Sequence, residues 1–176
     1  MKYFSKCITE SIYFCITKRN NFGIIGMDRL LIIRNKYFNE YTGLERTRGC
    51  IYSGTRAARA EIVARGMKKL AHDIGLLVAR NLDYDQVFYY AGMIHLAFVS
   101  IHPFADGNGR MARLLEKWFL HKKLGEMAWA IPSERLYFER KVSYYKNLGF
   151  RSDYSNIDYS LSIPFLKTLP MALNLK

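Results

Sequence analysis

A short segment near the middle of the chain combines the residue types that a metal-bound polyphosphate requires. Residues 102–110 read His-Pro-Phe-Ala-Asp-Gly-Asn-Gly-Arg, and Arg113 follows one helical turn later. The histidine accepts a proton near neutral pH, and the aspartate offers the hard oxygen ligands that divalent cations prefer. The Gly-Asn-Gly stretch exposes backbone N–H groups, and arginine matches phosphate oxygens with a planar fork. These types in this order predict a phosphate site with a base beside it.

The segment before the motif is predicted to be a largely buried helix over residues 86–101. Asp83 or Asp85 is expected to be its N-cap, because a short carboxylate accepts hydrogen bonds from the first helical N–H groups. Pro103 is expected to stop the helix, because the residue before a proline avoids the helical region.

The segment after the motif, residues 111–120, is predicted to be helical again, from about Asn108 to near Gly125. Its last turn carries three basic residues, which suit the negative end of the helix dipole: His121, Lys122 and Lys123. The free N–H groups at its start would face the loop and form an anion site. Arg110 and Arg113 are three residues apart and therefore share one face of its first turns.

Two simpler interpretations compete with this one. A loop with an aspartate and two glycines is often only a turn, but a turn does not explain the histidine and the two arginines that face the same loop. The segment lacks the Gly-Lys-Ser/Thr of a Walker A loop, and it lacks the preceding strand of a dinucleotide-binding fingerprint.

Residues 102–113, His-Pro-Phe-Ala-Asp-Gly-Asn-Gly-Arg-Met-Ala-Arg, resemble the signature of the Fic family, in which every defining position is filled. A weaker similarity extends over about residues 40–170. The resemblance implies transfer of AMP from ATP–Mg²⁺ to a Ser, Thr or Tyr hydroxyl of a target protein. His102 would be the general base that takes the hydroxyl proton, and Asp106 would bind Mg²⁺.

The same resemblance implies roles for the remaining motif residues. The anion hole would consist of Gly107, Asn108 and Gly109. Arg110 would neutralise the β-phosphate region, and Arg113 would neutralise the γ-phosphate or the leaving pyrophosphate. Tyr145 is expected to line the nucleotide site, although core packing is the competing interpretation for Tyr144 and Tyr145. Arg110 and Arg113 therefore count as catalytic together with His102.

Two rival functions remain open at this point. The first is transfer of another group, such as phosphate, UMP or a diphosphodiester head group, on the same scaffold. The retained Gly-Asn-Gly-Arg stretch and acidic position favour nucleotidyl transfer. The second is a catalytically silent basic module that binds an acidic protein or nucleic acid. The chain carries a net charge of +12, but its lysines and arginines are scattered and mark no nucleic-acid motif, so nucleic acid is not the expected partner.

Residues 45–54 occupy the place of the family's target-binding hairpin, called the flap. Ile51 and Tyr52 favour a strand, and Arg46 and Thr47 precede them, so these four residues are candidates for target binding. A plain basic loop is the equal alternative.

Many Fic enzymes are inhibited by a helix with the pattern [S/T]-x-x-x-E-[G/N], whose glutamate pairs with the second arginine. The chain contains no such pattern: Thr42 and Glu45 are three residues apart, and Ser5 and Glu10 are five apart. Self-inhibition by this motif is therefore not expected. A separate small antitoxin that supplies the helix is one expected partner; different regulation, or none, is the alternative.

Length and periodicity predict one mainly α domain over residues 1–176 with an N-terminal helical segment at 1–25. The resemblance implies that this domain is a Fic-type helical bundle with a short β-hairpin flap and its core at about 40–170. Further helices are expected over residues 27–41 and 57–77, and from a Ser133 cap to about Leu148. The helix at 57–77 has an apolar stripe of Ile62, Met67, Leu70 and Ile74. His95 is expected to be a packed or hydrogen-bonded histidine.

The remaining features concern the compartment. Cys7, Cys15 and Cys50 lack metal-site spacing and are expected to be free thiols in a reducing environment. Charges interrupt the N-terminal residues too early for a signal sequence, and no apolar run spans a membrane. A cytoplasmic protein is therefore expected, with export as an effector left open.

Overall fold

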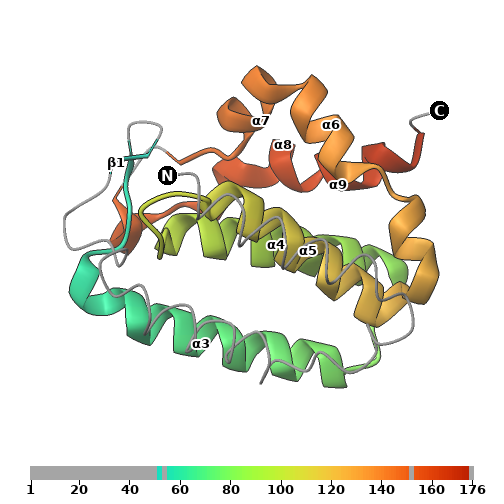
Figure 1. Cartoon of the computed structure of the whole chain (residues 1–176), viewed down its shortest axis with the longest axis horizontal. Coiled ribbons are helices and arrows are strands. Elements are labelled where there is room, and N and C mark those ends of the chain that lie inside the picture. Colours follow the sequence, from blue (N-terminus) through green and yellow to red (C-terminus); the bar gives the residue numbers. More distant parts are fainter. Residues whose placement is uncertain (1–50, 53–54, 151–152, 175–176) are drawn as a thin grey trace, which may run out of the picture. The chain divides into compact units, whose positions relative to one another are not determined.

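The computed structural model describes residues 51–52, 55–150 and 153–174, all of which belong to Gly43–Lys176, the second of two units into which the chain divides. This part is built from helices, which confirms the mainly α fold (Figure 1). The segment 1–25, the helix expected at 27–41 and all three cysteines lie outside the described residues. The single domain over residues 1–176 therefore stays a prediction.

Helices α4, Tyr84–Ile101, and α5, Asn108–Leu124, lie side by side and carry the centre of the fold (Figure 1). Asp83, not Asp85, caps α4: its carboxylate accepts the Gln86 N–H at 2.8 Å, and the Gln86 side chain accepts the Asp83 N–H at 3.2 Å. This reciprocal capping box satisfies two donors that the helix start leaves without partners. The predicted buried character of α4 is confirmed, since Ala91, Leu96 and most of its other residues are inaccessible to solvent.

Helix α3, Ala60–Ala79, packs against α4 but differs in detail from the predicted helix over 57–77. It begins later because the chain is still extended at Arg59, and the Ala58 N–H binds the Ser100 carbonyl at 3.3 Å. The predicted stripe was partly wrong: Leu70 and Ile74 are buried, but Val63 takes the inner position, whereas Ile62 and Met67 are half-buried.

The end of α5 also stabilises α3. Gly125 ends α5 with a φ of 61°, a left-handed conformation that glycine adopts without a steric cost. From the last turn of α5, the Lys123 ammonium donates to the carbonyl groups of Val78 and Arg80 at the end of α3. Burial lowers the pKa of Lys123. One lysine therefore satisfies carbonyl groups that the helix end leaves free.

One helix was predicted from a Ser133 cap to about Leu148, but the structure has two short helices there. Ser133 is the first helical residue, Pro132 is the N-cap, and the chain leaves the helical conformation at Arg140. The chain here forms short helices, of which α8 and α9 pack against α4 and α7 packs on α8 (Figure 1). Their bounds are α6 Ser133–Glu139, α7 Lys141–Asn147, α8 Ile163–Leu166 and α9 Thr168–Met171, with the 3-10 turns Gly125–Ala130, Tyr154–Asn156, Tyr159–Ser162 and Ala172–Asn174.

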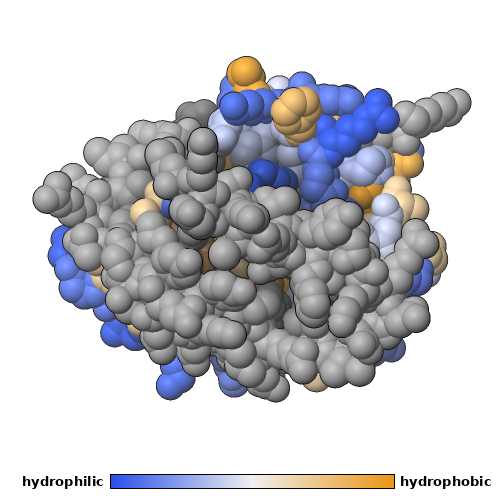
Figure 2. Space-filling view, in the orientation of Figure 1, coloured by the Kyte–Doolittle hydropathy of each residue, from blue (hydrophilic) through white to orange (hydrophobic). Residues whose placement is uncertain are grey.

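The described surface over α6 and α7 mixes apolar and charged side chains, seen as orange and blue patches at the top of Figure 2. Phe138 and Val142 are its most exposed large apolar residues. No helix in the described part of the chain is both long and apolar enough to cross a membrane.

Two short strands precede α3. Strand β1, Ile51–Tyr52, pairs with β2, Thr55–Arg56, in an antiparallel register that places Ile51 opposite Arg56. Arg46 and Thr47 lie outside the described residues. Target binding by this segment stays a prediction.

Candidate active site

His102 is the C-cap of α4 and has a left-handed backbone, with φ 54° and ψ 57°. Such a conformation is costly for a residue with a side chain, and it is typical of residues that a functional site holds in place. The ring Nδ1 lies 3.2 Å from the Val99 carbonyl. A carbonyl only accepts, so Nδ1 carries the proton of the neutral ring and Nε2 is the basic nitrogen.

Asp106 lies in the loop between α4 and α5. Its Oδ1 accepts the Gly107 N–H at 2.6 Å, and its Oδ2 accepts from Arg110 Nη2 at 3.0 Å. The carboxylate is 77% exposed, so this ion pair lies in solvent. Asp106 is therefore accessible to a ligand that arrives from outside.

Asn108 fixes the shape of the loop. Its Oδ1 accepts the Phe104 N–H at 2.9 Å, and its Nδ2 donates to the Phe104 carbonyl at 2.7 Å. The side chain is buried. In this structure the Asn108 amide therefore braces the loop. The place in the anion hole that the resemblance implies for Asn108 stays a prediction.

The start of α5 faces this braced loop. Gly107 is the N-cap, with a φ of 88°, and the first helical hydrogen bond runs from the Met111 N–H to the Gly107 carbonyl at 3.0 Å. By helix geometry the N–H groups of Asn108, Gly109 and Arg110 have no acceptor within the helix. The positive end of the helix dipole also attracts negative charge, so the helix start has the character of an anion site.

Arg113 lies one turn further along α5 and is half-buried. Its Nη1 would be 3.4 Å from a Cβ placed on Gly109, so the guanidinium lies over the first turn of the helix.

The structure thus brings His102, Asp106, Arg110 and Arg113 to one loop and the helix start that follows it. Tyr145 lies apart from the core and is 40% exposed, while its ring contacts Tyr144 edge-on at 5.1 Å. Core packing, the competing interpretation for these two tyrosines, is confirmed for Tyr144, which is buried. The nucleotide role of Tyr145 stays a prediction.

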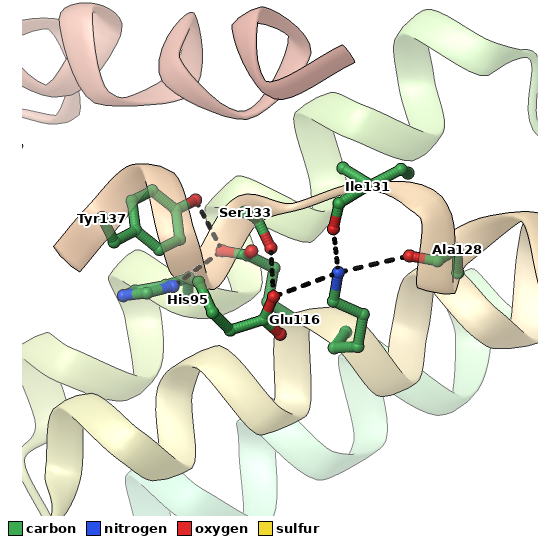
Figure 3. A network of polar contacts seen from close by, with 8 residues as sticks. His95, Glu116, Ala128, Ile131, Ser133 and Tyr137 are labelled. Carbon is green, nitrogen blue, oxygen red and sulfur yellow. Dashed lines mark hydrogen bonds and ion pairs between the residues drawn. The ribbon is translucent and has the colours of Figure 1, made fainter. Parts of the chain in front are cut away.

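A buried polar network behind the loop was not foreseen as a whole. Glu116 is fully buried, and its Oε2 lies 2.7 Å from His95 Nδ1 and accepts from the Tyr137 hydroxyl at 3.0 Å (Figure 3). His95 Nε2 lies 2.9 Å from the Tyr144 hydroxyl, so the expectation of a hydrogen-bonded His95 is confirmed. Within the described residues, Glu116 Oε1 has no hydrogen-bond partner. Glu116 is the one acidic residue of α5 and stands beside the apolar Leu115 and near Trp118, which is the sequence signal that could have revealed this network.

A second buried charge lies next to the first. The Lys117 ammonium donates to the carbonyl groups of Ala128 and Ile131, and it lies 3.3 Å from the Glu134 carboxylate. These contacts link α5 to the turn and the helix that follow it. Lys117 therefore fixes the surroundings of the network rather than the loop.

No group of three or more His, Cys, Asp or Glu side chains that could hold a metal ion occurs in the described part of the chain. Mg²⁺ does not require one, because it commonly binds through one or two carboxylates together with substrate phosphates and water. The exposed Asp106 beside an anion site fits that mode.

Comparisons with known proteins agree with this geometry. The family model described as Fic/DOC family matches residues 25–120, more than half of the chain. A protein adenylyltransferase Fic from Culex quinquefasciatus is 45% identical over 51 residues, which cover 24% of this chain and 10% of that protein. The crystal structure of a Fic family protein from Desulfovibrio desulfuricans G20 superposes with a TM-score of 0.58 at 28% identity, covering 75% of this chain and 40% of that one.

The chain therefore spans only part of the length of both relatives. The family match itself includes the whole motif from His102 to Arg113. The resemblance seen in the sequence is confirmed, and the chain belongs to the Fic/DOC family.

Proposed function

We propose that this chain is a protein adenylyltransferase, which transfers AMP from ATP to a Ser, Thr or Tyr hydroxyl of a target protein. One observation carries the proposal: a braced loop connects the strained His102 to a helix start that bears Arg110 and Arg113. The partial likeness to a protein named adenylyltransferase supports the same reaction. Transfer reactions of this kind depend mainly on positioning and on stabilisation of charge.

In the proposed reaction His102 Nε2 takes the proton of the target hydroxyl. The hydroxyl oxygen forms a bond to the α-phosphorus, and the bond from that phosphorus to the bridging oxygen breaks. Pyrophosphate leaves with the electron pair, and its charge is neutralised by Arg110 and Arg113. The N–H groups of residues 108–110 stabilise the charge on the transferred phosphate.

Asp106 is the residue that would hold Mg²⁺, which when bound neutralises phosphate charge. Its ion pair with Arg110 must open for both residues to meet the nucleotide. An exposed ion pair of this kind stabilises a protein by only about 0–1 kcal/mol, so opening it costs little free energy. The same change frees Arg110 for the β-phosphate.

The proposal extends to partners. The hairpin of β1 and β2, with the residues before it, would pair with the target's backbone as an added strand. A small antitoxin that supplies the inhibitory helix remains part of the proposal. The chain lacks the inhibitory glutamate pattern, and the absence of self-inhibition by that motif stays a prediction.

The test uses ATP labelled at either the α- or the γ-phosphate, with Mg²⁺ and a cell lysate. AMP transfer predicts a protein band labelled from the α-position alone, with an adduct of the mass of AMP. Label from the γ-position would instead identify phosphate transfer, and an adduct from UTP would identify UMP transfer. The binding module would be favoured if no nucleotide gave an adduct and a salt-sensitive interaction survived His102→Ala.

A further inference from the structure

A buried hydrogen bond joins the helix that ends at the proposed base to the helix that begins at the anion site. His95 Nδ1 on α4 lies 2.7 Å from Glu116 Oε2 on α5, and both side chains are fully buried (Figure 3). A carboxylate only accepts, so Nδ1 donates. The bond lies seven residues before His102 and three residues after Arg113. It therefore connects the two helices about two turns from the base and about one turn from the arginine.

The surrounding residues hold both partners of this bond in place. The imidazole centroid of His95 lies 5.0, 5.6 and 5.8 Å from the ring centroids of Phe165, Tyr137 and Tyr144. The second ring nitrogen of His95 lies 2.9 Å from the Tyr144 hydroxyl, and Glu116 Oε2 also accepts from the Tyr137 hydroxyl at 3.0 Å. The direction of the bond is therefore fixed from both sides.

A buried carboxylate stabilises a core poorly. Glu116 has lost its hydration, and among the described residues its Oε1 has no hydrogen-bond partner. Apolar residues buried on both helices, such as Leu96 and Phe119, make non-directional contacts, whereas a hydrogen bond weakens when its atoms move out of line. The bond is therefore suited to specify the register of α5 against α4, a use attested for buried polar groups between helices.

This register matters because the parts of the proposed site lie on different helices. His102 is the C-cap of α4. The anion site begins at the Gly107 N-cap of α5 and includes Arg110 and Arg113 in its first turns. A displacement of α5 along α4 would move the base relative to the phosphate while the phosphate site itself stayed intact. A misplacement of about 1 Å can lower a reaction rate about 100-fold.

We propose that His95 and Glu116 are positioning residues that hold His102 at the correct distance from the phosphate site on α5. This inference rests on the proposed function, in which His102 takes the proton of the target hydroxyl. It predicts that loss of the bond lowers the rate of AMP transfer while the affinity for Mg²⁺–ATP stays the same. A role in stability alone predicts no such separation.

The chain offers variants that isolate this bond. The triple variant His95→Phe/Glu116→Met/Tyr137→Phe replaces the bonded groups with apolar side chains of similar size, an exchange that is often neutral or stabilising. Tyr137→Phe alone is the control, because its hydroxyl binds the same Glu116 oxygen but joins α5 to α6. Glu116→Gln is the conservative variant, since it keeps an oxygen that accepts from His95, and its transfer rate should lie within about threefold of wild type.

Two measurements are made on each variant. One is the initial rate of label transfer from saturating α-labelled Mg²⁺–ATP to the proteins of a cell lysate. The other is calorimetry, which gives the Kd of Mg²⁺–ATP and the number of binding sites per chain. We expect the triple variant to transfer at least about tenfold more slowly than Tyr137→Phe, with its Kd changed less than about threefold and its number of sites unchanged.

Several results would overturn the inference. The first is a triple variant that transfers label at the rate of Tyr137→Phe. The second is a loss of rate that a weaker Kd, or a lower number of sites from unfolded protein, accounts for. The third is a Glu116→Gln rate as low as that of the triple variant. Should the triple variant fail to fold, Glu116→Asp keeps the carboxylate but shortens its reach, and the rate should again fall at constant Kd; an unchanged rate would overturn the inference.

Failure of the proposed function would look different, because wild type would then transfer no label. The position of α5 is in that case followed by NMR, through the amide signals of Gly107 and Gly109 at its start. These signals should move in the triple variant and stay in place in Tyr137→Phe, because only the former loses the bond between α4 and α5. Signals that stay in place in both variants would contradict the positioning role.

Discussion

At Asn108 a single amide makes two hydrogen bonds to Phe104 across the loop between α4 and α5. Asn108→Ala removes both and leaves the half-buried N–H and carbonyl of Phe104 without these partners. We expect the free energy of unfolding to fall by about 1–3 kcal/mol and AMP transfer to fall with it. Urea unfolding and the labelling assay measure the two effects.

Asn147→Ala is the control, because it removes an amide from the last residue of α7, outside the loop. If both alanine variants lost the same stability and activity, Asn108 would have no special role in the loop.

The identities of the motif residues could be read from the sequence, since each type matches one part of a polyphosphate. The partners of Asn108 could not, because spacing does not show which backbone groups a side chain reaches.

Among the elements, the turn after α7 depends on one glycine. Gly149 has a φ of 71°, and a Cβ there would lie 2.3 Å from the Leu161 carbonyl oxygen. Gly149→Ala therefore forces the backbone of the following segment to move. We expect it to lower the free energy of unfolding by at least about 2 kcal/mol, from strain and overpacking together.

Gly75→Ala is the control variant, and it is expected to change stability in the opposite direction. Gly75 lies within α3, and a Cβ there would have nothing within 4 Å. Because alanine favours the helix over glycine, the variant should be more stable by about 0.5–1 kcal/mol. Thermal unfolding of both variants checks the pair, and equal Tm changes would refute the assignment of strain to Gly149.

The bounds of α4 and α5 followed closely from their sequence because capping residues, a proline and a glycine lie at their ends. The break at Arg140 between α6 and α7 could not be predicted, since no proline or glycine marks it. The same limit applied to α3, whose start depends on a contact of Ala58 with Ser100, far away in the sequence.

For the molecule as a whole, buried tyrosines predict a loss of stability in alkaline solution. Burial raises the pKa of Tyr144 and of Tyr137, and Glu116 raises that of Tyr137 further. The unfolded chain releases these protons from about pH 10, whereas the folded chain keeps them. Their contribution is therefore complete below about pH 10 and is lost as the pH rises toward the folded pKa values.

Each tyrosine should lower the free energy of unfolding by about 1.4 kcal/mol for every pH unit within this window. Urea unfolding between about pH 8 and pH 11 measures the slope. Tyr144→Phe should make the slope of the free energy of unfolding against pH less steep, because phenylalanine has no hydroxyl proton to release. An unchanged slope would show that Tyr144 titrates normally in the folded protein.

The mainly α character of the molecule was predictable, because apolar residues recur at helical spacing. The network was not predictable as a whole, because it joins His95 to Glu116, 21 residues away, and to Tyr144, 49 residues away. Only the packing of the helices brings these residues together. Glu116, the one acidic residue of α5, was the local signal.

The central claim is that His102 is the base for AMP transfer, and one comparison tests it most directly. The rate of label transfer from α-labelled ATP to protein is measured for wild type, His102→Ala and His72→Ala, which removes an exposed histidine of α3. We predict that His72→Ala matches wild type and that His102→Ala is slower by at least about 100-fold, the usual contribution of a general base. Transfer by His102→Ala at the wild-type rate would contradict the account.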